Sequence, residues 1–346
     1  MENRFTIQQA IAQIVNGANL ERAEARLVMA DIMEGKATAA QIASLITALS
    51  MKGETSEEIT GFAESMRSMS NRVLTETSNL LDTCGTGGDG ADTFNISTAS
   101  ALVAAAGGIR VAKHGNRAMS SKSGSADVLE ALGVNIQLNG EQAAKCLTDV
   151  GICFMFAQHF HQSMKHAAIP RREIGIRTIF NLLGPLTNPA GADHQLLGIF
   201  DRTKTELIAQ VMLELKVKRG LVVASMDGLD EISISAATQV TELKNEQIHS
   251  YQIGPDDLGL RVSSIDAIKG GDAQTNAAII HAVFQGAHGA HRDIVLANAG
   301  ACFYVSGRVG TLQEGVKLAG SIIDSGKANM KLADLIRCTR ELCHVS

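Results

Sequence analysis

The sequence contains no tryptophan and only two tyrosines among its 346 residues, and aromatic residues make up 3% of it. Proteins that hold single-stranded nucleic acid stack the bases on aromatic side chains, which are scarce here. The formal charge of -5 at pH 7 also gives no overall basic field for nucleic acid or for an anionic membrane. We therefore expect small-molecule partners, and neither nucleic acid nor a membrane.

The six cysteines form no C-x-x-C pair and have no spacing typical of a metal site. They stand at positions 84, 146, 153, 302, 338 and 343. The sequence has no run of about 18 apolar residues, and its first residues, MENRFTIQQAIAQ, contain no apolar core of a signal peptide. We therefore expect reduced thiols in a cytoplasmic protein.

The chain does contain 33 glycines and 45% hydrophobic residues, enough for one large or two modest domains. Within residues 1–70, Thr6, Thr38 and Thr55 each precede a Gln or Glu by three residues, and apolar side chains then recur at helical spacing. Glycines at 17, 35 and 53 follow where these helices should end, and residues 19–33 predict a fourth helix. A small helical bundle is expected, which can also bury a face against a second subunit.

From residue 79 onward, short apolar runs alternate with helix-length segments, as is typical of a largely parallel sheet covered by helices. The predicted strands are 79–83, 109–112, 152–156, 196–200 and 221–225, followed by TQVTEL and IHSYQI around a turn at Lys244 and Asn245. The predicted helices are 97–106, 126–132, 141–150, 205–215, 274–284 and 312–325. The fold class is therefore α/β, with a small helical N-terminal domain and a large α/β domain that has a mainly parallel central sheet.

The stretch GTGGDG at residues 85–90 fits the dinucleotide fingerprint G-x-G-x-x-G, but its surroundings do not. A dinucleotide site needs a helix that opens directly from the glycines, but the helix after them begins only near Ser97. The next strand then ends in the cationic stretch KHGNR, residues 113–117, where a dinucleotide site needs an acid. No Lys-Ser/Thr pair follows the glycines, as a Walker loop would require. The remaining interpretations are a phosphate-binding turn and an ordinary surface turn.

Three further stretches favour phosphate binding. NIST, residues 95–98, places hydroxyl groups at a helix start, which suits an anion but also fits an ordinary helix cap. KHGNRAMSSKSGSAD, residues 113–127, concentrates three cations at the end of a strand. DGLDE, residues 227–231, adds adjacent carboxylates, which are hard oxygen ligands of the kind Mg2+ prefers.

Together with RREIGIRTIFNLLGPLTNPAG, these stretches resemble the anthranilate phosphoribosyltransferase family in order and spacing, over nearly the whole chain. The resemblance implies transfer of the phosphoribosyl group of 5-phosphoribosyl 1-pyrophosphate to the amine of anthranilate, in tryptophan biosynthesis. It implies a fold of the nucleoside phosphorylase/phosphoribosyltransferase type. The helical domain would cover 1–70 and be completed by a segment near 165–185, and the α/β domain would cover 75–164 and 186–346.

The resemblance also implies roles for individual residues. Those expected to contact phosphoribosyl pyrophosphate are Gly85, Gly88, Asp89, Thr93, Asn95, Ile96, Ser97, Thr98, Lys113, His114, Gly115, Asn116, Arg117, Ala118, Met119, Ser120, Ser121 and Ser125. Asn116 and Arg171 would bind anthranilate, with Arg171 at its carboxylate. Ser97, Asp230 and Glu231 would hold Mg2+, two ions per monomer, and the helical domains would form a homodimer.

Displacement of pyrophosphate from the anomeric carbon should pass through an oxocarbenium-like state. The main catalytic task is then to stabilise the departing diphosphate, for which Lys113 and Arg117 are suited. Because an aromatic amine is neutral at pH 7, no strong base is required, and His114 is either a general base or a structural residue of its loop. Two alternatives stay open: a pyrimidine nucleoside phosphorylase-like enzyme, and a nucleic-acid-binding relative without enzymatic activity, against which the net acidic charge argues.

Overall fold

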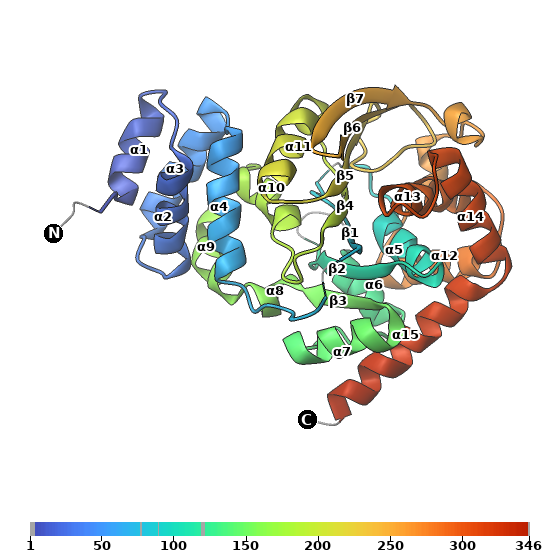
Figure 1. Ribbon diagram of the computed structural model, residues 1–346. Coiled ribbons are helices and arrows are strands. Elements are labelled where there is room, and N and C mark those ends of the chain that lie inside the picture. Colours follow the sequence, from blue (N-terminus) through green and yellow to red (C-terminus); the bar gives the residue numbers. More distant parts are fainter. Residues whose placement is uncertain (1–3, 77, 89, 119–121, 345–346) are drawn as a thin grey trace.

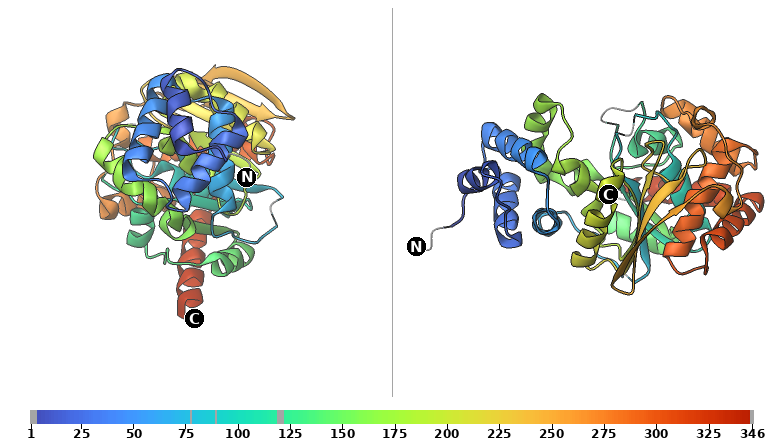
Figure 2. Two further views of the ribbon diagram at one scale, coloured as in Figure 1. Left: turned by 90° about the vertical axis from the view of Figure 1, so that its left-hand side faces the viewer. Right: turned by 90° about the horizontal axis from the view of Figure 1, so that it is seen from above.

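The computed structural model describes residues 4–76, 78–88, 90–118 and 122–344. A helical N-terminal part stands beside a larger α/β part (Figure 1), and the view from above separates the two most clearly (Figure 2). The N-terminal helices are α1 (Ile7–Val15), α2 (Arg22–Met33), α3 (Ala39–Lys52) and α4 (Ser56–Ser68). All four predicted helices are thus confirmed.

Capping boxes fix the starts of α1, α3 and α4, as the sequence pattern predicts. Thr6, Thr38 and Thr55 each accept a hydrogen bond from the backbone N–H three residues further on, and the Gln or Glu at that position bonds back to the cap. A cap of this kind typically contributes about 1 kcal/mol to stability. α3 ends at Gly53, whose φ of 88° is one that glycine adopts without strain.

Seven strands form one sheet in the order β3-β2-β1-β4-β5-β6-β7. β1 to β5 are parallel, whereas β6 and β7 are antiparallel to their neighbours. The strands are β1 (Leu80–Gly85), β2 (Arg110–Gly115), β3 (Ile152–Phe156), β4 (His194–Gly198), β5 (Arg219–Ser225), β6 (Thr238–Lys244) and β7 (Gln247–Ile253). All seven predicted strands are confirmed, with ends shifted by a few residues. The mainly parallel sheet follows from the alternation of strands and helices.

Helices cover both faces of this sheet (Figure 1). The helices that follow β1 in the chain are α5 (Ile96–Ala106), α6 (Ser125–Ala131), α7 (Gly140–Val150), α8 (Ala157–Phe160), α9 (Lys165–Ile174), α10 (Ile179–Leu186), α11 (Thr205–Glu214), α12 (Ala273–Phe284), α13 (Ala290–Val305), α14 (Leu312–Asp324) and α15 (Lys327–His344). α5 and α13 pack together on one face of the sheet, with α14 outside them, and α11 packs on the other face against β5 and β6.

The core of the helical part is continuous with the core beneath α11. One cluster of buried apolar side chains includes Phe62 of α4, Phe180 of α10, Met212 of α11 and Val222 of β5. α9 and α10, which lie against α3 and α4, come from the segment expected to complete the helical domain. The exact limits of the two domains stay a prediction, because the shared core does not divide at one residue.

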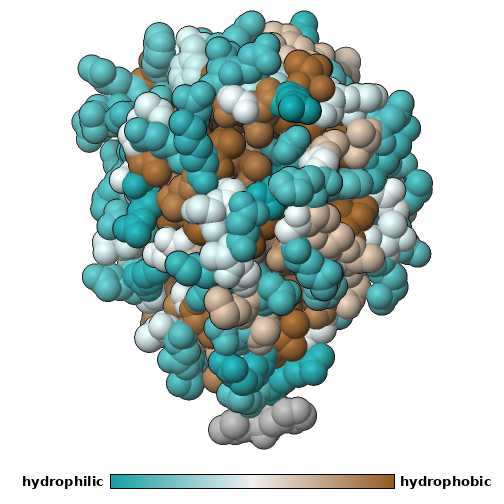
Figure 3. Space-filling model, turned by 90° about the vertical axis from the view of Figure 1, so that its right-hand side faces the viewer, coloured by the Kyte–Doolittle hydropathy of each residue, from teal (hydrophilic) through white to brown (hydrophobic). Residues whose placement is uncertain are grey.

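The side of the molecule that carries α12, α13 and α14 mixes hydrophilic side chains with separate apolar patches (Figure 3). Val262 and Met330 are among the large apolar residues that are exposed to solvent, at 63% and 57%. Every helix among the described residues is too short or too polar to cross a membrane.

Candidate active site

The glycine loop follows β1 at the carboxyl edge of the sheet. Gly87 and Gly88 have φ values of 67° and 75°, in the left-handed region that glycine adopts freely. The N–H of Gly87 donates to Oδ2 of Asp230 at 2.6 Å. A Cβ at Gly85 would meet that carboxylate, and a Cβ at Gly198 would overlap the backbone oxygen of Asp230. The absence of side chains at the ends of β1 and β4 therefore lets the Asp230 segment lie directly against the glycine loop.

The carboxylates of the DGLDE stretch point to different parts of the structure. Oε1 of Glu231 accepts the backbone N–H of Ser97 in the first turn of α5 at 3.1 Å, while Asp230, 8% exposed, faces the glycine loop. Asp227 instead accepts the hydroxyl of Ser233 at 2.7 Å and stabilises its own loop. Only Asp230 and Glu231 thus belong to the site.

These residues can serve a magnesium ion only together with other ligands. Among the described residues, no three His, Cys, Asp or Glu side chains are grouped closely enough to hold a metal ion by themselves. Mg2+ commonly uses one or two carboxylates and takes its other ligands from water and substrate phosphates. Two carboxylates and the hydroxyl of Ser97, all hard oxygen donors beside an expected phosphate site, fit that pattern.

β1 and β2 separate where the candidate site begins. Their ladder ends at Leu81 after two residue pairs, whereas the ladder between β2 and β3 contains five. Beyond Leu81, side chains replace backbone partners: Oδ1 of Asp82 accepts the N–H of His114 at 3.2 Å, and Nζ of Lys113 donates to the backbone oxygen of Thr83 at 2.6 Å. Side-chain hydrogen bonds of Asp82 and Lys113 therefore connect the two strands where their backbone pairing has ended.

Lys113 is the buried cation of the site. Its Nζ also donates to the hydroxyl of Ser97 at 3.2 Å, and the residue is only 3% exposed. Its negative neighbour is Asp82, which is completely buried. Burial raises the pKa of Asp82 to about 6, partly offset by a hydrogen bond from Asn188 and by the charge of Lys113. Sequence analysis did not single out Asp82, although it is the lone acid within the apolar run NLLDTC.

Asn95 occupies the cap position of α5, but its side chain does not cap the helix. Its amide donates to the backbone oxygen of Ser123 at 3.1 Å and accepts a hydrogen bond from the side chain of Asn276 at 2.9 Å. Asn276 lies on α12 and is 1% exposed, so a distant part of the chain holds Asn95 in place. The interpretation of Asn95 as an ordinary side-chain cap is therefore wrong.

The other predicted residues at this end of α5 are placed differently. Ile96 and Thr98 are buried, and Oγ1 of Thr98 has no hydrogen-bond partner among the described residues. Thr93 forms an isolated antiparallel bridge with Lys269. The N–H of Ile96 donates to the backbone oxygen of Phe94 at 2.8 Å, so neither its side chain nor its N–H is placed to bind a phosphate.

Asp127, in the first turn of α6, holds the loop after β2 together. Its Oδ2 accepts the N–H groups of Ala118 and Gly124 at 3.0 and 2.8 Å. The hydroxyl of Ser125 donates to the backbone oxygen of Asn116 at 3.3 Å. These hydrogen bonds therefore hold Asn116 and Ala118, at the start of the loop, close to Gly124 and Ser125, at its end. Four predicted contact residues, Asp89, Met119, Ser120 and Ser121, lie outside the described residues.

Arg117 is engaged by carboxylates of α6. Its guanidinium donates to Asp127 at 2.8 Å and to both oxygens of Glu130 at 2.5 and 3.0 Å, and it lies 5.4 Å from the ring centre of Phe156. These hydrogen bonds raise the pKa of Arg117 further above its already high value. A role of Arg117 at the diphosphate would require it to leave these partners.

His114 is buried at the end of β2, 6% exposed, beside Gly115, where a Cβ would meet the hydroxyl of Ser125. Its ring lies 5.1 Å from the ring of His161. Burial, together with the neighbouring His161, lowers the pKa of His114 to about 3. The imidazole is therefore neutral at pH 7.

Of two arginines on the helical side, Arg171 and Arg177, the structure places Arg177 against the glycine loop. Arg171 of α9 lies 5.0 Å from the ring centre of Phe180, and burial lowers its pKa. Arg177, between α9 and α10, lies 3.9 Å from the ring centre of Phe200, and its Nε is 3.5 Å from the position of a Cβ on Gly88. Sequence analysis missed Arg177, although it lies within the stretch RREIGIRTIF that follows the predicted Arg171.

The structure therefore brings Gly85, Gly88, Ser97, Lys113, Asp230 and Glu231 together at one edge of the sheet. A buried ammonium, a glycine turn and two carboxylates form its centre, and Arg177 approaches from the helical part. Such a site can bind an anion through N–H groups and cations, and a divalent cation through the carboxylates.

Comparison with known proteins shows which family the chain belongs to. Residues 77–329 match the glycosyl transferase family, a/b domain, and residues 8–70 match the glycosyl transferase family, helical bundle domain. The chain is 54% identical to an anthranilate phosphoribosyltransferase of Brevibacillus brevis over 97% of this chain and 99% of the relative. It is 52% identical to one from Acetivibrio thermocellus over 96% of each chain.

Solved structures are similar over the same extent. A crystal structure of anthranilate phosphoribosyltransferase from Thermus thermophilus is 42% identical, with a TM-score of 0.91, and the match covers 96% of this chain and 99% of that chain. The Saccharomyces cerevisiae enzyme in complex with PRPP and Mg is 25% identical, with a TM-score of 0.89, over 97% of this chain and 98% of that chain.

Proposed function

The chain belongs to the anthranilate phosphoribosyltransferase family, and we propose on that basis how its residues share the work of that reaction. It transfers the phosphoribosyl group of 5-phosphoribosyl 1-pyrophosphate to the amine of anthranilate, giving N-(5-phosphoribosyl)anthranilate and pyrophosphate in tryptophan biosynthesis. The observation that supports it best is the meeting of the Gly87–Asp230, Ser97–Glu231 and Ser97–Lys113 hydrogen bonds at the carboxyl edge of the sheet.

The diphosphate and the ribose phosphate bind along this edge. The N–H groups of Gly87 and Ser97 already donate to Asp230 and Glu231, so phosphate oxygens bind the remaining N–H groups of the glycine turn and of the first turn of α5. The helix dipole favours negative charge there. Lys113 adds a positive charge that is already desolvated, so it loses little hydration when the substrate arrives. Ser97, Asp230 and Glu231 would hold Mg2+, two ions per monomer, and the metal would neutralise the charge of the diphosphate.

Catalysis depends on positioning and on charge. The bond between the anomeric carbon and the pyrophosphate oxygen breaks as the anthranilate nitrogen approaches the opposite face of the sugar. Lys113 stabilises the negative charge that develops on the leaving group. Arg117 also stabilises this charge once its guanidinium has left Asp127 and Glu130 of α6. His114 is neutral and buried, which supports a structural role in its loop.

Anthranilate binds between the α/β part and the helical part. Arg171 meets its carboxylate as a charge-assisted fork, and Asn116 contacts it from the loop after β2. Arg177, beside the glycine loop, would close the same space from the helical side. We further propose a cytoplasmic homodimer formed through the helical domains, where Val15 and Met51 are exposed at 69% and 84%.

The fluorescence of anthranilate tests the reaction directly. On mixing the purified protein with phosphoribosyl pyrophosphate and Mg2+, we expect the fluorescence to fall, and EDTA to prevent the loss. Phosphate-dependent cleavage of thymidine or uridine by the same protein would instead identify a nucleoside phosphorylase. A folded protein with neither activity would contradict the proposal.

A further inference from the structure

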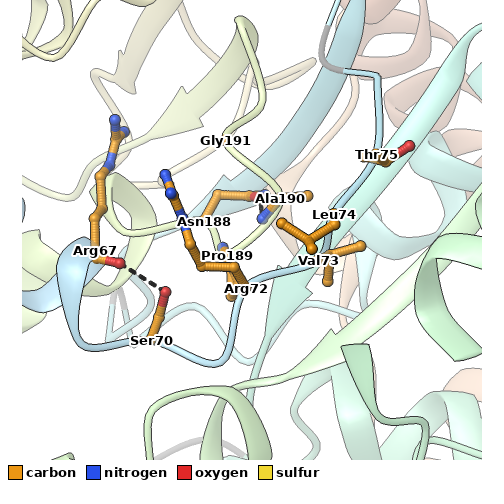
Figure 4. Close-up of a pocket in the computed structure, with 10 residues that line it drawn as sticks. All are labelled: Arg67, Ser70, Arg72, Val73, Leu74, Thr75, Asn188, Pro189, Ala190 and Gly191. Atoms are coloured by element: carbon orange, nitrogen blue, oxygen red, sulfur yellow. Dashed lines mark hydrogen bonds between the residues drawn. The ribbon is translucent and has the colours of Figure 1, made fainter. Parts of the chain in front are cut away.

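A cavity lies at the edge of the sheet opposite the candidate active site. Its volume is about 330 Å3, and it lies between the end of α4, residues 70–75 and residues 188–191 (Figure 4). The first of these segments leads into β1 and the second into β4, which are parallel neighbours and therefore begin at the same edge. The N–H of Val73 donates to the backbone oxygen of Pro189 at 3.2 Å and joins the two segments.

Two guanidinium groups define the charge of this cavity. The side chains of Arg67 and Arg72 extend in the same direction from their backbones (Figure 4). Burial lowers the pKa of Arg67 to about 10, and the nearby charge of Arg72 acts in the same direction. Glu64 is the acid that opposes this effect, but Arg22 engages it at 2.6 Å. Two like charges thus share one cavity, and neither forms an ion pair with a carboxylate of the described chain.

The hydrogen bonds of Arg67 leave donors available. Nε donates to the backbone oxygen of Leu186 at 2.8 Å, and Nη1 donates to that of Leu215 at 3.2 Å. A guanidinium has five N–H groups, so further donors remain for a ligand. Arg72 is exposed, and its guanidinium makes no hydrogen bond within the described residues.

The rest of the lining has apolar and already satisfied groups. Val73, Leu74, Pro189 and Ala190 supply apolar surface, and Leu74 is 82% exposed. The side chain of Asn188 is used within the protein, because its amide donates to Ala112 and its oxygen accepts from Ala190. A ligand that fits must therefore carry its negative charge at one end and a small apolar group at the other.

We propose that this cavity binds a phosphate monoester with a compact apolar group, at a site separate from the active site. The charge of about -1.5 to -2 on a phosphate monoester at pH 7 balances two guanidinium groups, whereas a single carboxylate balances only one. A volume of about 330 Å3 is at the lower end for small-molecule sites and suits a small ligand.

Isothermal titration calorimetry with phenyl phosphate tests this site on the full chain. Saturating phosphoribosyl pyrophosphate and Mg2+ fill the phosphoribosyl part of the active site, and the comparison with Arg72→Ala separates binding in the cavity from any binding in the anthranilate part, which stays empty. We expect one phenyl phosphate per chain, and Arg72→Ala to weaken its binding by about tenfold or more, since a hydrogen bond to a charged group is lost. Arg308→Ala, which removes another exposed arginine elsewhere, should leave the affinity unchanged.

Arg72→Ala is the main variant because Arg67 also holds two backbone oxygens, so its loss could disturb folding. Equal affinity in Arg72→Ala and the wild type would overturn the proposal, as would the absence of binding to the wild type. Benzoate, with one negative charge, should lose less affinity on Arg72→Ala than phenyl phosphate does. Because the readout is binding, it remains informative whatever the catalytic activity of the protein proves to be.

Discussion

Replacing Asp82 by Asn should change how the stability of the protein depends on pH. The folded pKa of Asp82, about 6, lies above its ordinary value of 3.8, so the folded chain keeps a proton that the unfolded chain releases. The free energy of unfolding of the wild type therefore contains a contribution that is full below pH 4 and is lost as the pH rises to about 6. A difference of 2.2 pKa units corresponds to about 3 kcal/mol.

Asn keeps an oxygen that can accept the N–H of His114, but it carries no charge. Urea unfolding of both proteins at pH 4, 5, 6 and 7, followed by circular dichroism, measures the two free energies of unfolding. We expect the value for the variant minus that for the wild type to rise by about 2 kcal/mol between pH 4 and 6, because the rest of the change falls below pH 4 and above pH 6. His114 and His161 also titrate abnormally, but both proteins contain them, so their contributions largely cancel.

The exposed Asp256 provides the control, because Asp256→Asn should leave the difference nearly constant over this range. A difference between Asp82→Asn and the wild type that is flat, or that falls between pH 4 and 6, would show that the buried carboxyl is not raised in pKa. It would also show that burying the Asp82 carboxylate beside Lys113 does not lower the free energy of unfolding at neutral pH.

Three further substitutions test the site. Lys113→Met should lower kcat by about 10²- to 10³-fold, since it removes a preorganised charge at the leaving group; unchanged turnover in the anthranilate fluorescence assay would contradict this role. Gly198→Ala should raise the KM for Mg2+ and phosphoribosyl pyrophosphate in steady-state kinetics, because the new Cβ displaces Asp230, whereas Gly184→Ala, which adds a Cβ in open space, should not. Arg177→Ala should raise the KM for phosphoribosyl pyrophosphate while changing the free energy of unfolding by less than about 0.5 kcal/mol, and an unchanged KM would place Arg177 outside the site.

Local sequence patterns predict most of the helices and strands of this fold. The Thr-x-x-Gln/Glu patterns at Thr6, Thr38 and Thr55 form capping boxes because every group in them lies within one turn of helix. Apolar runs became strands because a strand buried on both faces needs few polar residues. The approach of Asp230 and Glu231 to the glycine loop follows from the same logic, since the carboxyl ends of parallel strands share one edge.

What sequence analysis missed depends on contacts between distant residues. Asn95 resembles a helix cap until Asn276, 181 positions away, occupies its oxygen. Asp82 could not be distinguished from other acids before the two strands were seen to separate. The loop between α9 and α10 positions Arg177, and the conformation of such a loop cannot be predicted from the periodicity of apolar residues. The sequence indicated which groups are present and which strand ends they follow, but not these pairings.

The core that the helical bundle shares with α10, α11 and β5 has a consequence during synthesis. Helices α1 to α4 leave the ribosome well before the later buried members of their core, which run from Ala167 to Leu243. About 100 residues separate the end of α4 from Ala167, which corresponds to about 5 to 20 s at 5 to 20 residues per second. During that interval the apolar face of the newly made bundle is incompletely covered, and this is the stage at which a chaperone would protect the nascent chain from aggregation.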